Sequence, residues 1–185
     1  MSYEINLNIE EEKSEQVDFS LIPAGTKALF TVNKSQVIFK DKSRQKMKEF
    51  TQDTGEVLIN FEFEILEGAF KSRRIWQDFC TMWNNPPIEY TDKKTGKQAK
   101  FYPEATGRGQ LGALADACGL ESTLSDSSEL HGLTFVGTIG VKKSKDPQYA
   151  SKNELKKFFS NNSSVSSDDI PFTATEQKAK PAWKK

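Results

Sequence analysis

The fold is decided by residues 56–66, which read EVLINFEFEIL. Large apolar side chains occupy every second position, whereas most positions between them carry Glu or Asn. This period of two predicts a β-strand with one buried face, formed by Val57, Ile59, Phe61, Phe63 and Ile65. Glu67 and Gly68 then predict a turn, and the extended run Lys71–Phe79 predicts a second strand that pairs with the first as a β-hairpin.

The segment before this hairpin predicts further extended structure. Residues 23–25, Pro-Ala-Gly, precede a strand expected at Thr26–Asn33, which Gln36–Lys40 extends or follows. Polar residues and lysines fill Asp41–Gly55. We therefore expect a long, mobile, basic loop between these strands and the hairpin.

One helix and one late strand are expected after the hairpin. Residues 84–87, Asn-Asn-Pro-Pro, end the extended structure, and Asp92–Lys100 is predicted to be a second basic loop or hairpin tip. Apolar residues then recur at helical spacing from Leu111 to Cys118, and Gly119 is placed to end that helix. A capping box over residues 126–129 precedes the strand expected at residues 133–141.

The order of these elements is strands, helix and strand, without the repeated alternation of a doubly wound fold. We predict a mainly β domain over residues 1–159, built as a small antiparallel barrel of the oligonucleotide-binding (OB) type with one or two helices. Residues 160–167 are rich in Ser and Asn, so residues 160–185 are expected to form a flexible tail.

Composition argues against several classes of protein. The 185 residues suit one ordinary domain, none of the apolar stretches is long enough for a membrane span, and the first residues are acidic where a signal peptide would be basic. A cytoplasmic location is expected. With two cysteines, Cys80 and Cys118, and one histidine, His131, a zinc site is not expected, and both thiols are predicted to be reduced and buried. No cofactor is predicted.

Three patterns that could suggest an enzyme are weak. Gly107–Gly112 matches a dinucleotide-binding string, but the preceding Phe101–Glu104 is too short and proline-broken for a central parallel strand, and no second βα unit follows. The alternatives are a flexible helix entry, or backbone N–H groups that meet a phosphate beside Arg108. Glu62 and Glu64 lack the further acids of a metal-dependent nuclease and are expected to be solvated. His131 is the only base available to activate a serine. We predict a protein that is not an enzyme.

The net charge of zero hides blocks of opposite sign. Residues 1–25 carry six acids and one base, whereas residues 26–50 carry seven bases and two acids. Further basic blocks lie at Lys93–Lys100 and Lys142–Lys157. Such blocks can form a positive surface for a polyanion, although an ordinary solvated surface is the alternative.

Aromatic residues stand among these bases. Alternation places Arg74, Trp76 and Asp78 on the strand face opposite Ile75 and Phe79. A Trp beside an Arg on an exposed strand suits single-stranded nucleic acid, because bases stack on the ring while the guanidinium pairs with phosphate. The alternative is that the large aromatic side chains fill the core.

Four short segments resemble a known family. They are Ile22–Thr26, Phe63–Gly68, Phe70–Trp76 and Glu129–Gly132, and the similarity runs from about Ile22 to Phe159. The family is found in bacteriophages, was long described as a domain of unknown function, and is encoded among replication and recombination genes. Its members are thought to bind single-stranded DNA. The present chain departs from that pattern by long basic insertions at residues 33–55 and 88–100.

The tail carries a second resemblance. Asp168, Asp169, Ile170, Pro171 and Phe172 are similar to the acidic tip with which bacterial single-stranded DNA-binding proteins dock their replication and repair partners. In those proteins the Phe is the last residue, whereas here residues 173–185 follow. The resemblance implies a partner-binding peptide on a flexible tether.

Together these observations predict a sequence-tolerant single-stranded DNA-binding protein of phage DNA replication or recombination. The alternative is an adaptor that recruits or inhibits a replication or recombination enzyme through its tail without contacting DNA. An oligomer is compatible with either. The residues expected to stack on bases are Trp76, Trp83, Tyr90 and Tyr102, and those expected to contact phosphates are Lys42, Arg44, Lys46, Arg73, Arg74, Lys97 and Arg108.

Overall fold

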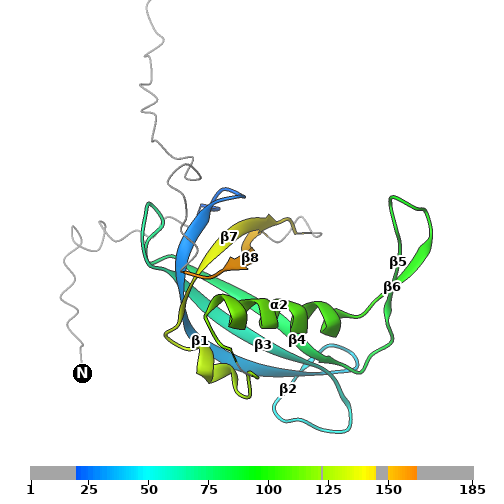
Figure 1. Cartoon of the computed structure of the whole chain (residues 1–185). Helices are drawn as coiled ribbons and strands as arrows, with labels where there is room; N and C mark the ends of the chain where they lie inside the picture. The colour runs from blue at the N-terminus through cyan, green and yellow to red at the C-terminus, as the bar shows by residue number, and fades with distance from the viewer. Residues whose placement is uncertain (1–19, 122, 145–149, 162–185) are drawn as a thin grey trace, which may run out of the picture.

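A curled antiparallel sheet forms the body of the protein. The computed structural model describes residues 20–121, 123–144 and 150–161, and Figure 1 shows the sheet with one long helix packed across it. The five main strands are β1 (Lys27–Asp41), β3 (Thr54–Ile65), β4 (Arg74–Trp83), β7 (Thr134–Lys142) and β8 (Lys152–Phe159).

The strands are ordered β4-β3-β1-β7-β8, and all neighbours are antiparallel. β1 joins the two halves of the sheet, because Lys27–Thr31 pair with β7 and Phe30–Asp41 pair with β3. The sheet curls until its end strands, β4 and β8, meet. The Gln77 side chain links them: its Nε2 donates to the Leu155 carbonyl at 3.3 Å, and its Oε1 accepts from the Leu155 N–H at 2.7 Å.

This architecture confirms the predicted mainly β, antiparallel fold. Counted along the chain, the five main strands lie in the order 3-2-1-4-5, and the helix falls between the third and the fourth. That order, with the fifth strand returning to the third, is the arrangement of a partly open OB-type barrel. Within the described residues no main-chain ladder joins the two end strands, and the Gln77 side chain is the link between them that the structure shows.

The core is aromatic. Phe30, Phe61, Phe63, Phe79 and Phe135 are fully buried, and the Phe63 ring meets the Phe79 and Phe135 rings edge to face. Alternation in β3 is as predicted over Phe61, Phe63 and Ile65, whereas Val57 and Ile59 are only half-buried. These rings bury large apolar areas against one another, which stabilises the sheet on one face only.

Some expected boundaries were confirmed and others were wrong. Gln36–Lys40 extends the strand expected at Thr26–Asn33, which was one of the two alternatives, and both segments apart from Thr26 belong to β1, with a register shift between Val32 and Lys34. The loop expected at Asp41–Gly55 is shorter and contains β2 (Lys46–Met47), which pairs back onto β1. The second hairpin strand begins at Arg74 and not at Lys71, because residues 66–73 form a wider turn.

The helix, α2 (Pro103–Ala117), begins earlier than expected and ends before Gly119, whose positive φ of 80° suits a glycine after a helix. Residues 107–112 therefore lie inside α2, and neither a helix entry nor a phosphate-binding loop forms there. Gly107 has a packing reason: a Cβ at this position would lie 2.1 Å from the carbonyl oxygen of Cys80. The glycine lets α2 approach β4.

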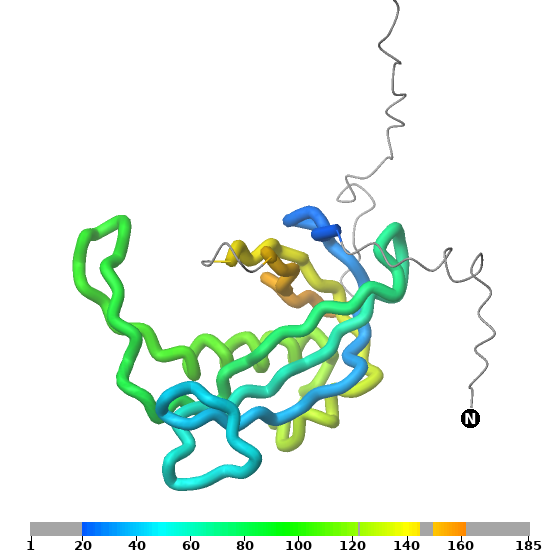
Figure 2. The backbone as a smooth tube through the Cα atoms, turned by 180° about the vertical axis from the view of Figure 1, so that it is seen from behind, coloured from blue at the N-terminus to red at the C-terminus, as the bar shows by residue number. Residues whose placement is uncertain are grey.

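Smaller elements complete the described chain. The capping box predicted at residues 126–129 is present and opens the single turn η1 (Ser127–Leu130). A two-stranded ribbon, β5 (Ile88–Thr91) and β6 (Gln98–Phe101), projects from the body, as Figure 2 shows from behind. We call residues 88–101 the arm. In the part of the chain described, none of the helices is long and apolar enough to cross a membrane.

Candidate nucleic-acid interface

The outer face of β1, β3 and β4 carries polar residues in matched positions. Residues opposite one another on neighbouring antiparallel strands share a face, and Glu62 lies between Lys34 of β1 and Trp76 of β4. Six residues along β3, Glu56 lies between Lys40 and Trp83 in the same way. At the rise of a strand the two positions are about 20 Å apart.

The first group, which we call the Trp76 cluster, comprises Trp76, Glu62, Lys34, Arg74 and Asn33. Glu62 accepts hydrogen bonds from the indole N–H of Trp76 at 3.1 Å and from Nδ2 of Asn33 at 3.4 Å. It also forms ion pairs of 3.0 Å with Lys34 and with Arg74. Asn33 occupies the register shift of β1, which turns its side chain toward Glu62 and Glu64.

Glu62 is buried, contrary to the expectation that it would be solvated. Its side chain is 5% exposed, because Lys34 and Arg74 extend over it and Trp76 lies beside it. Burial alone would raise the pKa of Glu62, but hydrogen bonds from Lys34, Trp76 and Asn33 outweigh that effect and hold the pKa below its ordinary value. The carboxylate is therefore charged at neutral pH and fixes the Trp76 ring.

Trp76 itself remains open. It is 51% exposed, the largest value among the exposed large apolar residues of the strands and arm. Arg74, Trp76 and Asp78 are all exposed, whereas Ile75 and Phe79 are buried, so the predicted alternation of β4 is confirmed. The indole edge is anchored, and part of the ring is available to a ligand.

The second group, which we call the Trp83 cluster, comprises Trp83, Arg44, Glu56 and Lys40. The side chain of Glu56 is 2% exposed and pairs with Lys40 at 3.2 Å and with Arg44 at 3.4 Å. The Arg44 guanidinium lies over the Trp83 ring, 5.3 Å from its centroid. The indole N–H of Trp83 donates to the Pro86 carbonyl at 3.1 Å and not to a glutamate. Trp83 is therefore covered by the loop between β1 and β3.

That loop also supplies cations that remain available. Arg44 adopts a left-handed backbone conformation with φ of 65°, which is unusual for a residue with a side chain, and its two contacts hold it there. Lys42 and Lys46 lie on either side, are exposed, and form none of the ion pairs found among the described residues. The loop therefore offers free positive charge beside a strained, fixed arginine.

The other predicted residues lie elsewhere. Tyr90 and Lys97 belong to the arm, and Tyr102, 52% exposed, lies between the arm and α2. Arg73 lies in the turn before β4, where it donates to the Ser20 carbonyl and lies over the Phe70 ring. One of its terminal nitrogens is buried without a partner among the described residues. Arg73 is therefore a structural residue.

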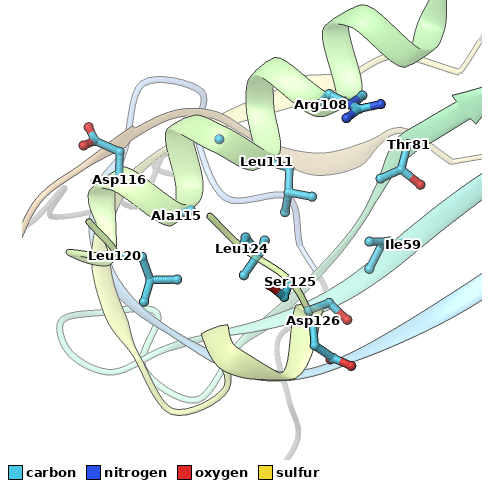
Figure 3. Close-up of a pocket in the computed structure, with 12 residues that line it drawn as sticks. Ile59, Thr81, Arg108, Leu111, Ala115, Asp116, Leu120, Leu124, Ser125 and Asp126 are labelled. Carbon is cyan, nitrogen blue, oxygen red and sulfur yellow. The ribbon is translucent and has the colours of Figure 1, made fainter. Parts of the chain in front are cut away.

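Arg108 lies on α2, on the core side of the sheet. It lines a hollow of about 490 Å³ between α2, the sheet and residues 120–127, and it pairs with Glu104 at 3.2 Å. Figure 3 shows Arg108 and Thr81 on one side of this hollow and Leu120 on the other. Nearby, the Oγ atom of Ser35 is 2.8 Å from Nε2 of His131, a bond that fastens the chain after η1 to β1. Arg108 does not share a face with Trp76.

The remaining predictions concern cysteines, metals and the tail. Cys80 and Cys118 are free thiols, the first buried and the second half-buried, and burial raises the pKa of Cys118 to about 11. No three His, Cys, Asp or Glu side chains come together as metal ligands in the described ranges. The predicted docking peptide, residues 168–172, lies outside the described residues.

Sequence reasoning missed the residues that organise the face. Glu56 and Glu62 were expected to be ordinary strand acids, and Lys34 and Lys40 were not singled out. A signal was present in the sequence, because each glutamate stands at a polar position of β3 opposite an aromatic residue of β4. This signal could be recognised only after the register of β3 on β4 was known.

The chain matches none of the models of known protein families, and none of the curated proteins is significantly similar to it.

Proposed function

We propose that this protein binds single-stranded DNA with little sequence preference. The observation that carries the proposal is Trp76, a half-exposed ring fixed by a buried carboxylate on the second and third main strands of an OB-type barrel. This face and the loops beside it are where OB folds bind oligonucleotides. Base stacking on an aromatic ring tolerates any sequence, because every base has a π-face.

Charge on the interface is divided between two regions. Within the Trp76 cluster, Lys34 and Arg74 are balanced by Glu62 and the neighbouring Glu64. Attraction of phosphates must therefore come from lysines outside the clusters, such as Lys42 and Lys46. The sheet supplies stacking, and the loop supplies the positive field.

The biological setting rests on the resemblance of four segments to a phage family. It supports a role for the proposed activity in phage DNA replication or recombination, in the cytoplasm of the host bacterium. Residues 168–172 then serve to recruit a replication or recombination partner. The OB-type fold is compatible with this setting but is shared by proteins with many other functions.

A titration with labelled oligonucleotides tests the proposal. We expect single-stranded DNA of roughly 20 nucleotides to bind more tightly than duplex of equal length, with quenching of tryptophan fluorescence. The logarithm of the binding constant should fall linearly with the logarithm of salt concentration. If the folded protein neither binds DNA nor shows quenching of its fluorescence at low salt, DNA binding is overturned and the adaptor function is favoured. Tighter binding of single-stranded RNA than of single-stranded DNA would show that RNA is the ligand.

A further inference from the structure

The arm has two chemically different faces. Its register places Ile88 opposite Phe101 and Tyr90 opposite Ala99, so these four residues share one face. The opposite face carries Glu89 paired with Lys100 at 3.8 Å, and Thr91 bonded to Gln98 at 3.1 Å. One side of the ribbon is therefore aromatic and apolar, and the other is polar.

The apolar face is unsupported by the body. β5 and β6 pair only with each other, and Ile88, Tyr90 and Phe101 are between 38% and 48% exposed. An isolated two-stranded hairpin is marginally stable in water and gains from packing against something else. Figure 1 shows the ribbon standing clear of the sheet and of α2. A binding partner that packs against this face would bury it and stabilise the ribbon.

The charge on the arm selects that partner. Residues 88–101 contain four lysines and two acids. Both acids are engaged, because Glu89 pairs with Lys100 and the Asp92 carboxylate accepts backbone N–H bonds from the turn. Lys93, Lys94 and Lys97 are left without ion pairs among the described residues. A second copy of the arm would set these lysines against one another, whereas a polyanion would neutralise them.

The arm also begins where the Trp83 cluster ends. The indole N–H of Trp83 donates to the Pro86 carbonyl, two residues before β5, and Asn84 donates to the Thr54 carbonyl at the start of β3. The root of the arm is therefore tied to the sheet. The arm therefore continues from the end of β4 that carries Trp83.

We propose that the apolar face of the arm is a second stacking platform, which extends the single-stranded DNA site beyond the barrel. Bases pack on Tyr90 and Phe101 while phosphates meet the lysines of the tip. This inference rests on the proposed function of the sheet. It adds one consequence, namely that the arm contributes to the binding of long strands and not of short ones.

A comparison of strand lengths tests the inference in the full chain. The variant Y90A/F101A removes the two rings, and T91A/Q98A, on the polar face of the same ribbon, is the matched control. For oligonucleotides of roughly 20 nucleotides, we expect Y90A/F101A to weaken binding at least about tenfold and T91A/Q98A to leave it unchanged. For oligonucleotides of roughly 6 nucleotides, both variants should bind as the wild type does.

A second variant covers the case in which the double substitution unfolds the ribbon. Replacement of residues 88–101 by a short Gly-Ser turn should leave cooperative melting intact and reproduce the loss for long strands. If the wild type binds strands of neither length, the proposed function fails. If the wild type binds and both arm variants bind long strands equally well, only the arm inference fails. A wild-type dimer that becomes a monomer in these variants, with DNA affinity unchanged, would assign the arm to self-association.

Discussion

The Trp76 and Trp83 clusters share a plan and differ in access. Each places a tryptophan of β4 opposite a buried glutamate of β3, with two cations on that glutamate. In the Trp76 cluster the indole N–H bonds to the glutamate and the ring stays half-exposed. In the Trp83 cluster the loop arginine lies over the ring, and the indole bonds to the main chain instead. One platform is open, and the other is covered.

The difference shows how a buried acid can serve a site for a polyanion. Glu62 and Glu56 would repel phosphate if they were exposed, but each is covered by cations that it holds in place. A neutralised carboxylate costs the interface little, and it fixes side chains that would otherwise sample many rotamers. Which tryptophan a base reaches first then depends on what lies over the ring.

The largest effect should come from loss of the open ring. W76A should weaken binding of single-stranded DNA by about 1–3 kcal/mol, because one stacking platform disappears. W83A should cost less, since its ring is already occupied by Arg44. Fluorescence titration at one salt concentration measures both. The thermal unfolding transition of each variant must stay cooperative. Equal losses of DNA affinity in the two variants would refute the distinction between open and covered rings.

The next largest effect should come from neutralising the glutamates beside the two tryptophan rings. E62Q should destabilise the fold by about 1–2 kcal/mol, because four donors lose a charged acceptor. This figure is already reduced because Lys34 and Arg74 are exposed and solvent screens their charges. E56Q should cost less, because Glu56 serves two donors. Chemical denaturation measures both. E89Q, in an exposed ion pair of the arm, is the control and should change stability by less than about 0.5 kcal/mol.

The sequence predicted the exposed tryptophan, Trp76, but not the buried glutamate that fixes it. Trp76 could be identified because Ile75 and Phe79 alternate with it, and a period of two places it on the outer face. Glu62 could not, because its burial depends on Lys34, which is 28 positions earlier in the sequence. That contact requires the register of β1 on β3, and a register is set by the whole sheet.

Two elements show the same limit. β8 was not predicted, because Glu154-Leu-Lys-Lys157 has helical propensity, and only pairing with β7 makes the segment extended. β5 and β6 were expected as a basic loop or hairpin tip, which located the turn at residues 92–97 but not the apolar face. Local patterns therefore located strands and turns, whereas tertiary pairing decided which side chains meet.

The salt dependence should separate the loop from the sheet. Each phosphate contact on a single strand contributes a slope of about 0.7 to the plot of binding against salt. K42A/K46A should therefore flatten the slope by about 1.4. R73A is the matched control, because Arg73 is engaged with Ser20 and Phe70 away from the face. An unchanged slope in K42A/K46A would remove the loop from the interface.

Uncovering Trp83 should have a smaller effect. R44A removes the guanidinium from the ring, so Trp83 emission should shift to the red and become more accessible to acrylamide. R44G does the same and also relieves the left-handed backbone at this position. We expect R44G to be more stable than R44A by a few tenths of a kcal/mol up to about 1 kcal/mol. Identical emission in wild type and R44A would show that Arg44 does not cover the ring in solution.

The smallest effect should be the acid dependence of the Trp76 cluster. The folded pKa of Glu62 lies below its ordinary value of 4.5, so its charge stabilises the fold above that value and the contribution is lost as pH falls through the folded pKa. Asp92 and Asp126 also have lowered pKa values, from backbone hydrogen bonds, but both are present in wild type and E62Q and cancel in the difference. The stability gap between the two proteins should therefore be constant from about pH 7 to about pH 5 and should narrow below that range. Denaturation curves at several pH values measure the gap. If it closed near neutral pH instead, Glu62 would be protonated in the folded protein, and Trp76 would have no charged anchor.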